Sequence, residues 1–416
     1  MVDVLDVSDP TNPARVFGID VKEDLPDAGG INSVAVKNGL VAVAVENDLK
    51  TEDGWAAFYD TDGNAISQIP AGALPDAITF THNGSFALTA NEGEPNDDYT
   101  VDPEGSVTVI DLRAGAALAT ARQATFENFN DPNVPAGVRL PRPFGATVAQ
   151  DLEPEYIATS HDSKTAWVSL QENSAVAVVD IRSATVTDVV GLGSKDHSIE
   201  GNGLDPSNRD GGIYIAEWPV NGLHMPDSIA AFRAKGRTYL LTANEGDGRE
   251  YAYEVEAPAE ADFTACEARI GEVGEGKFNA GEADYDDEDD VLECIVYLDE
   301  IRIEDLDPEA LPFNPSFQDE SLLGRLKAVG TEGDTNGDGV YEQIYSYGAR
   351  SITLWDTEGH VVWDSGDTIE QVTALALPDD FNSTNDENDS FDARSDDKGP
   401  EPETAIVGKV SGRQYA

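Results

Sequence analysis

The sequence predicts an all-β protein, a β-propeller of four-stranded antiparallel blades, and a repeat carries this prediction. Four segments share one form: an apolar alternating run, a tight turn, a second apolar run, and a Glu beside an Asn. They are residues 30–47, 75–94, 154–173 and 226–247. After each comes a third apolar run that ends in Asp and a turn, and helical periodicity is nearly absent. Repeated units of this kind are the plan of propeller blades.

Segment 75–94 shows the first two strands most clearly. Ile78 and Phe80 keep a period of two, and Phe86 and Leu88 continue it after the turn, as half-buried strands require. Asn83-Gly84 between them is a strong hairpin signal. The third strands are expected at 55–63, 106–115, 175–184 and 351–359, each followed by a short fourth strand.

The number of repeats predicts four full blades and two halves in one propeller domain, residues 1–416. Residues 1–21 have the form of the last two strands of an earlier blade, and 400–416 begin a later one. The two halves could close into a single blade. The alternative that we favour is a chain cut at both ends, with about five blades of a seven-bladed parent.

Uneven spacing of the repeats indicates three insertions, at about 120–152, 193–225 and 246–350. The last is a long acidic insertion within one blade, with a short helical signal near 321–329.

The charge of the chain excludes some partners. There are 81 acidic and 26 basic residues, which gives a net charge of −55. Such a surface repels nucleic acid, whose phosphates need Lys and Arg. It attracts cations, and it suits a halophilic or marine protein, because salt screens the repulsion between its carboxylates.

Two further features bear on location. Cys266 and Cys294, the two cysteines, stand in one acidic stretch, and either a local disulfide or two free thiols fits the sequence. No run reaches the 18 or so apolar residues of a membrane helix, and the start of the chain reads as a strand rather than a signal peptide. If the chain is cut, a missing signal peptide says nothing about location.

The repeat places one class of acidic residue on one face. In a propeller, the start of strand one and the end of strand two share a face, so these residues should ring one mouth of the central channel. Either they bind a cation or ligand there, or each Glu caps loop amides in its own blade. The eight residues of this carboxylate mouth are Glu46, Asp76, Glu92, Glu155, Glu172, Asp227, Glu245 and Glu403.

Two loops offer calcium ligands, because calcium prefers oxygen atoms. Asp334, Asn336 and Asp338, followed by Gly339, match positions 1, 3, 5 and 6 of the twelve-residue calcium loop. Val340 would offer its carbonyl group, and Glu342 stands at position 9, but Tyr345 replaces the bidentate Glu at position 12. A site completed from elsewhere, or a plain polar turn, fits this pattern. The second loop offers Asp205, Asn208 and Asp210.

The sequence gives little support for nucleophilic catalysis. It has no G-x-S-x-G nucleophile elbow, no H-E-x-x-H zinc motif and no P-loop. His82 and His161 fall in strand-one turns, away from the carboxylate mouth. Any hydrolase would have to be metal-dependent, with carboxylates holding the ions that activate water. Arg394 and Lys398 could then contact an anionic substrate or pair with neighbouring acids.

Several long motifs resemble the bacterial choice-of-anchor I family. They include ANEGEPNDDYTVDPEGSVTVIDL at 90–112, KDHSIEGNGLDPSNRDG at 195–211 and RSDDKGPEPE at 394–403. The family is similar to mesenchyme-specific cell surface glycoproteins, and some members carry an alkaline phosphatase label or phosphoesterase modules. The resemblance implies an exported or surface-anchored protein with a YVTN- or WD40-like propeller, and it transfers no catalytic residues.

These observations lead to one expected function and one alternative. We expect an extracellular or cell-surface propeller that binds Ca²⁺ and acts as a binding or adhesion module. Its partner would be a surface ligand or a phosphorylated small molecule. The alternative is a metal-dependent phosphoesterase that uses the carboxylate mouth.

Overall fold

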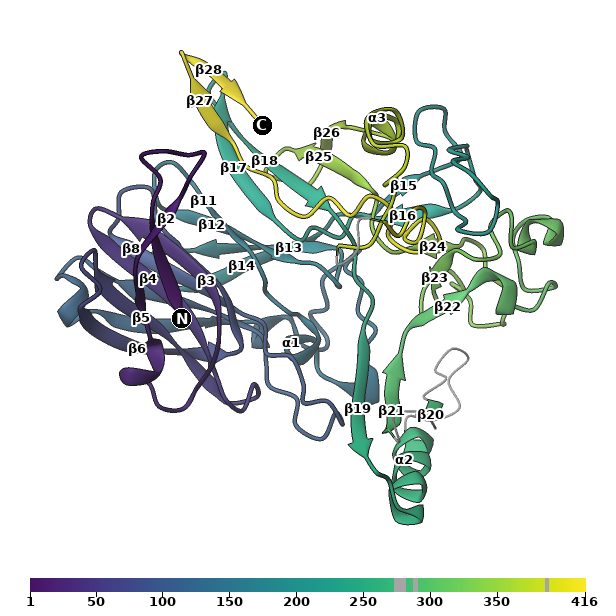
Figure 1. Ribbon diagram of the computed structural model, residues 1–416, viewed down its shortest axis with the longest axis horizontal. Helices are drawn as coiled ribbons and strands as arrows, with labels where there is room; N and C mark the ends of the chain where they lie inside the picture. The colour runs from purple at the N-terminus through teal and green to yellow at the C-terminus, as the bar shows by residue number, and fades with distance from the viewer. Residues whose placement is uncertain (273–281, 287–290, 386–388) are drawn as a thin grey trace.

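The computed structural model describes residues 1–272, 282–286, 291–385 and 389–416. It confirms the all-β propeller architecture, with four antiparallel sheets of four strands each (Figure 1). The first two blades are β3 (Ala28–Lys37), β4 (Leu40–Asn47), β5 (Asp53–Asp60) and β6 (Ala65–Ala73), and β7 (Pro75–Phe80), β8 (Phe86–Asn91), β9 (Ser106–Asp111) and β10 (Thr120–Thr125). The next two are β11 (Ile157–Thr159), β12 (Thr165–Leu170), β13 (Ala175–Asp180) and β14 (Thr185–Gly191), and β17 (Ile229–Ala234), β18 (Arg237–Asn244), β25 (Ser351–Trp355) and β26 (Val361–Asp364).

The blades are arranged around an axis with their first strands innermost. Strand β3 contacts β7, β7 contacts β11, and β11 contacts β17. A polar contact recurs at these junctions, where a side chain of one blade donates to the carbonyl group at the start of the next. Asn32 Nδ2 donates to Pro75 O at 3.2 Å, Ser169 Oγ to Asp227 O at 3.1 Å, and Ser228 Oγ to Glu403 O at 2.7 Å. Each of these three hydrogen bonds therefore fixes the backbone at the start of the segment that follows.

Apolar side chains between neighbouring blades form the core. Leu88 and Val109 of the second blade pack with Val168 and Val179 of the third, and all four are buried. Burial of each such side chain contributes about 1.5–3 kcal/mol. The strands of segment 75–94 were expected to be half-buried. Both of their faces are buried, because a neighbouring blade packs on each side.

The two halves at the chain ends form separate two-stranded sheets. β1 (Val2–Asp6) pairs with β2 (Ala14–Ile19), and β27 (Gly408–Val410) pairs with β28 (Arg413–Tyr415). They do not join into one blade. The β27–β28 hairpin lies beside β17 (Figure 1), and Val407 packs against the apolar cluster that includes Phe232.

The segment between the third and fourth blades and the insertion within the fourth blade together build a separate sheet of mixed direction. Its strand order is β15 (Ser194–Asp196), β16 (Asn221–Leu223), β24 (Tyr345–Ser346), β23 (Lys327–Val329) and β22 (Glu300–Arg302), and β16 runs parallel to β24. The helix signal near 321–329 was wrong: these residues form turns and β23. Leu323, Leu326 and Ala328 are apolar because they fill the core of this sheet rather than one face of a helix.

A hairpin projects from the rest of the molecule (Figure 1). It comprises β19 (Glu250–Glu256), β20 (Glu282–Asp286), β21 (Val291–Leu298) and helix α2 (Glu260–Glu272). The cysteines form a disulfide, which joins α2 to β21 through Cys266 and Cys294. The other helices are α1 (Val148–Asp151) and α3 (Thr368–Ala376). No helix in the described ranges is long and apolar enough to cross a membrane.

Buried ion pairs attach these additional segments to the propeller. Arg139 pairs with Asp299, and Arg249 pairs with Glu153. Arg350 pairs with Glu370 of α3 at 2.7 Å. All six side chains are at most 3% exposed, so loss of one partner would leave an uncompensated buried charge.

Candidate functional site

In the second and fourth repeats, the Asn before the Glu is a buried structural residue that positions this Glu. Asn91 ends β8 and accepts a hydrogen bond from Thr89 Oγ1 at 2.8 Å. Its amide nitrogen donates to Ser106 Oγ at 3.1 Å and Thr108 Oγ1 at 2.9 Å on β9. With its side chain satisfied inside the blade, Asn91 fixes the backbone that delivers Glu92 to the end of strand two.

Asn244 repeats this network in the fourth blade. It accepts from Thr242 Oγ1 at 2.8 Å, and it donates to Ser351 Oγ at 3.3 Å and Thr353 Oγ1 at 2.7 Å. The next residue is Glu245. The same local chemistry therefore serves two blades and sends a carboxylate to the same end of each.

The structure brings the eight carboxylates of the mouth together. Asp76 interacts electrostatically with Glu46, Glu155 and Asp227, which come from three other repeats. Glu172 is a neighbour of both Glu92 and Glu155. Glu245 and Glu403 are neighbours of Asp227. Residues up to 357 positions apart in the chain, Glu46 and Glu403, thus belong to one connected group.

A cavity of about 320 Å³ opens beside this group. Glu92 and Glu172 line it together with residues that the sequence did not single out. These are Glu94, Glu153, Asp247, Gly248, Arg249, Glu250 and Tyr251. Glu153 and Arg249 stand within the DLEPEY and NEGDGREY motifs, and the scarcity of Arg in this chain was a usable signal for Arg249.

Burial and mutual repulsion raise the pKa values of several carboxyl groups of the mouth. Burial, and then the Glu46 charge, raises the pKa of Asp76 to about 6. Burial, with Glu245 and Glu403 nearby, raises the pKa of Asp227 to about 7. Glu172, which is buried, has a pKa of about 7 even though Arg249 opposes the shift. Without a bound cation, the mouth therefore holds protons near neutral pH.

Among the described residues, two buried carboxylate oxygens of this group have no hydrogen-bond partner. They are Oε2 of Glu155 and Oε2 of Glu172. The two residues are 9% and 8% exposed. An orphaned carboxylate oxygen costs free energy, since it has lost its water and gained no donor. A proton or a cation at this position would remove that cost.

Few positive charges oppose the group within the described residues. Lys398 Nζ lies 3.2 Å from Glu245 and 3.3 Å from Asp247, while Lys50 Nζ lies 3.1 Å from Glu94. Arg249 pairs with Glu153. Arg394, the other candidate for substrate contact, is paired with Asp397 at 2.8 Å and with Glu401. Both sequence candidates, Arg394 and Lys398, therefore pair with acids.

Loop 334–342 is folded around its own carboxylates. The Asp334 carboxylate accepts from Gly337 N and Gly339 N, each at 2.8 Å, and from Asp338 N at 3.1 Å. Glu342 accepts from Thr335 N at 2.7 Å and from Asn336 Nδ2 at 2.8 Å. Asp338 accepts from Val340 N at 2.9 Å. This arrangement gathers Asp334, Asn336, Asp338 and Glu342 within one exposed turn.

The second loop lies apart from the mouth. Asp205 is fully buried, accepts from Tyr214 N at 2.7 Å, and has a pKa raised to about 7, chiefly by burial. Asp210 accepts from Gly212 N at 3.0 Å, and Asn208 accepts from Arg325 at 3.5 Å. Asp205 and Asp210 therefore hold their own loop, while Asn208 contacts a distant segment. Over the residues that the structure describes, no three His, Cys, Asp or Glu side chains already form a metal-binding group.

The buried histidines are held by backbone carbonyl groups rather than beside a nucleophile. His197 Nδ1 lies 2.6 Å from Asn202 O, and His224 Nδ1 lies 3.2 Å from Gly193 O. Burial lowers the pKa of His224 to about 4, so it is neutral at physiological pH.

Comparison with protein families decides the relationship. The model of the choice-of-anchor I domain matches residues 1–416. The chain belongs to the choice-of-anchor I family. The resemblance seen in its motifs is confirmed over the whole length.

Two curated proteins are similar to this choice-of-anchor I domain. One is the mesenchyme-specific cell surface glycoprotein of Strongylocentrotus purpuratus, 28% identical over 327 residues, or 70% of this chain. The other is Gigasin-3a of Magallana gigas, 37% identical over 98 residues, or 22% of this chain. The matches span 38% and 34% of those proteins, so this chain corresponds to about a third of their length.

Solved structures give weaker likenesses to the choice-of-anchor I chain. The Cps50 (Swd1) β-propeller domain of Myceliophteria thermophila has a TM-score of 0.35 at 9% identity and covers 58% of each chain. The luciferin-regenerating enzyme has a TM-score of 0.32 at 10% identity, over 56% of this chain and 58% of that one. The evidence for the propeller architecture is therefore the arrangement of four-stranded sheets in this chain itself.

Proposed function

We propose that this chain is an extracellular calcium-binding β-propeller that acts as a surface binding module. The observation that carries the proposal is the carboxylate mouth with its orphaned oxygens, Glu155 Oε2 and Glu172 Oε2. Calcium takes six to eight oxygen ligands and tolerates irregular geometry, which a group of carboxylates from several blades can supply. Bound calcium would offset the repulsion that now raises the pKa values of the mouth.

Three observations support the proposed location. The sea urchin relative is named a cell surface glycoprotein, and it matches 70% of this chain. The Cys266–Cys294 disulfide fits an oxidising compartment. The net charge of −55 suits a salty medium, so we also propose a halophilic or marine setting.

Calcium at the mouth would have Glu92, Glu155 and Glu172 as its first candidate ligands. These residues interact with one another, and Glu92 and Glu172 also line the 320 Å³ cavity. Backbone carbonyl groups and water would complete the shell, since no three-residue metal group is preformed in the described part of the chain. A ligand on the surface would reach the metal through the cavity.

Loop 334–342 is proposed as a second, independent calcium site. Its Asp334 accepts three backbone amides of its own turn, which keeps the oxygens at positions 1, 3 and 5 together. Asn336, Asp338, Glu342 and the Val340 carbonyl group complete the candidate donor set, and all are oxygen donors suited to calcium. Asp205, Asn208 and Asp210 form a third candidate, which is weaker because Arg325 donates to Asn208 and brings a positive charge to the loop.

The experiment is a calcium titration of EGTA-treated protein by calorimetry, repeated with Glu155→Gln, Glu172→Gln and Asp334→Asn. Each Glu variant should weaken the mouth site about tenfold or more, while Asp334→Asn should remove one equivalent of calcium from the total. Exposed Glu358 supplies the control, and Glu358→Gln should bind as the unaltered chain does. No calcium uptake, or equal binding by all variants, would refute the proposal.

A metal-dependent phosphoesterase is the second candidate, favoured by one observation. Arg249 is one of the residues that line the cavity with Glu92 and Glu172, and Arg is well suited to phosphate, with its buried guanidinium group paired to Glu153. Hydrolysis of p-nitrophenyl phosphate, measured with Ca²⁺, Mn²⁺ or Zn²⁺, tests it. Turnover that Glu172→Gln abolishes would support the enzyme, and turnover at background with every ion would refute it.

A further inference from the structure

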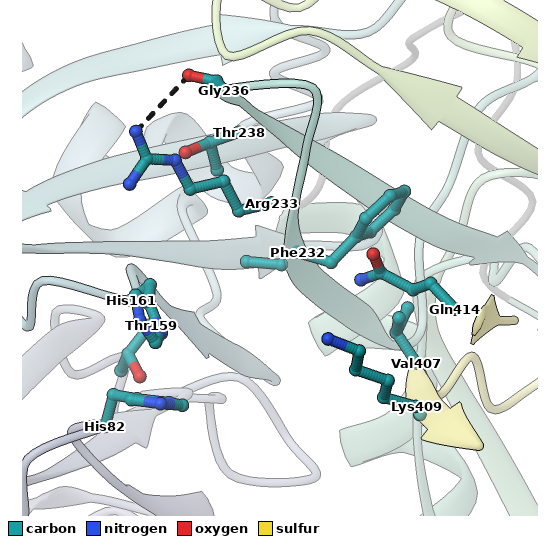
Figure 2. Close-up of a pocket in the computed structure, with 12 residues that line it drawn as sticks. His82, Thr159, His161, Phe232, Arg233, Gly236, Thr238, Val407, Lys409 and Gln414 are labelled. Carbon is teal, nitrogen blue, oxygen red and sulfur yellow. Dashed lines mark hydrogen bonds between the residues drawn. The ribbon is translucent and has the colours of Figure 1, made fainter. Parts of the chain in front are cut away.

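A second and larger cavity, of about 690 Å³, lies at the other end of the inner strands. β17 begins two residues after Asp227 of the mouth and ends at Ala234 beside this cavity, so the mouth and the larger cavity lie at opposite ends of this strand. The turn residues of the second, third and fourth blades meet the β27–β28 hairpin around it (Figure 2). We call it the cationic pocket. Its lining residues include His82, His161, Arg233 and Lys409.

The charge of this lining is opposite to that of the chain. None of its twelve residues is acidic, although acids make up 81 of 416 residues and about two would be expected among twelve. Arg233 and Lys409 have no carboxylate partner among the described residues: the guanidinium group of Arg233 donates only to Gly236 O, at 3.5 Å. Other exposed cations of the described chain also lack an acidic partner, so the distinguishing feature of this pocket is that no acidic residue lines it.

The surrounding turns extend the same positive character. Lys37, Lys235, Arg237 and Arg413 stand at the turns that join the first two strands of their units, and none has an ion-pair partner in the described ranges. Lys37 lies near His82 and contributes, after burial and His161, to lowering the pKa of His82. Unpaired cations kept together in so acidic a chain favour an anion as the occupant.

The remaining groups of the pocket suit a hydroxylated ligand. Thr159, Thr238 and Gln414 offer hydroxyl and amide groups, and the half-buried Phe232 supplies an apolar surface. The rings of His82 and His161 lie 4.2 Å apart on one side, and Figure 2 shows Lys409 and Gln414 on the other. The volume falls within the range of small-molecule sites.

We propose that the cationic pocket binds a small anionic sugar, with its sulfate, phosphate or carboxylate group held by Arg233 and Lys409. Its hydroxyl groups are bound by Thr159, Thr238 and Gln414. This site is separate from the carboxylate mouth and does not depend on calcium, because the pocket lining offers no carboxylate to a metal.

The test uses calorimetry with glucose 6-sulfate, glucose 6-phosphate and glucuronate, and with glucose as the uncharged probe, on EGTA-treated protein. At least one charged probe should bind more than about tenfold tighter than glucose, and a rise in salt should weaken it. The three charged probes separate the possible anionic groups. Binding of glucose equal to that of every charged probe, or no binding by any probe, would overturn the proposal.

Matched variants localise the binding. Lys409→Gln and Arg233→Gln should each weaken the charged probe about 5- to 30-fold, as expected for loss of one charged hydrogen bond. Lys22 is a lysine without an ion pair that lies outside the pocket, so Lys22→Gln removes the same charge elsewhere and should leave affinity within about twofold. Both pocket side chains are exposed, so the variants should melt as the unaltered chain does. Equal weakening by all three variants would show an unspecific charge effect and refute the site.

Discussion

At the scale of single residues, the two members of the Asn-Glu pair have different roles: the Asn stabilises the blade, and the Glu lies at the mouth. Asn91 and Asn244 are fully buried and satisfied by Ser and Thr side chains of the neighbouring strands. The next residue, Glu92 or Glu245, reaches the mouth. A satisfied buried amide rigidifies the strand end, and this rigidity lets carboxylates gather in spite of their repulsion.

Asn91→Ala should destabilise the protein by about 2–4 kcal/mol, because it leaves the hydroxyl groups of Thr89, Ser106 and Thr108 without their shared partner. Urea unfolding measures the change. Exposed Asn12 provides the control, and Asn12→Ala should stay within about 0.5 kcal/mol. Equal midpoints for the two variants would show that the network adds nothing.

Stability of the calcium-free protein should fall as pH rises from about 4 to about 7. Asp76 and Asp227 have folded-state pKa values of about 6 and about 7, above their unfolded value, so the native state binds more protons in this window. The charges that face Asp76 are Glu46, Glu92, Glu155 and Asp227, and those that face Asp227 are Asp76, Glu155, Glu245, Glu403 and Lys398.

Melting temperatures in EGTA across this window measure the effect. His224 contributes with the opposite sign, since its pKa is lowered to about 4, so the informative quantity is a difference between proteins. The Asp76→Asn/Asp227→Asn double variant should lose less stability on going to neutral pH than the unaltered chain. Parallel curves for the two proteins would contradict this prediction.

At the scale of elements, close packing decides where the inserted segments leave and rejoin their blade. Gly246 follows β18 and Gly348 precedes β25, and both have positive φ, +97° and +69°. A Cβ on Gly348 would lie 1.8 Å from Glu245 O, and one on Gly246 would lie 2.1 Å from Gly348 N. Only glycine allows this approach, which places Glu245 and Asp247 beside the mouth.

The Cys266–Cys294 disulfide should hold the projecting hairpin rather than the propeller. The two cysteines are 28 residues apart in the sequence. A disulfide that closes a loop of this length stabilises the folded state by about 3 kcal/mol. Cys266→Ser/Cys294→Ser should therefore be cut in the 250–298 region about 10- to 100-fold faster by trypsin or endoproteinase Glu-C, with little change in overall melting. Dithiothreitol should speed cleavage of the unaltered protein only. Equal cleavage of both proteins would show that packing alone holds α2.

At the scale of the whole molecule, charge is separated along the propeller axis. Carboxylates collect where inner strands begin, and unpaired cations collect at the pocket where they end. The chain as a whole carries −55. Repulsion among these charges opposes the compact state, and dissolved salt screens it.

Raising NaCl from about 0.1 M to about 2 M should increase the melting temperature by about 5 °C or more, since the Debye length falls below the spacing of surface carboxylates. Differential scanning calorimetry in EGTA measures this, and KCl should act alike because screening is not ion-specific. A flat or falling curve would contradict a halophilic adaptation.

Local patterns in the sequence are sufficient to predict the blades and the negative charge of one face. Period-two alternation, the Asn-Gly turn and the recurring Glu are local signals, and each blade forms from residues close together in the chain. The carboxylates lie close together in the structure, because strand direction alternates regularly within each blade and brings the same position of each repeat to the same face.

The surroundings of these residues depend on long-range packing, which local patterns do not predict. Arg249 meets Glu153 across 96 positions, Lys398 meets Glu245 across 153, and β16 pairs in parallel with β24. Such contacts depend on how long insertions return to the propeller, and no local pattern encodes that. The cationic pocket arises in the same way, because its residues come from three blades and a terminal hairpin that packing alone brings together.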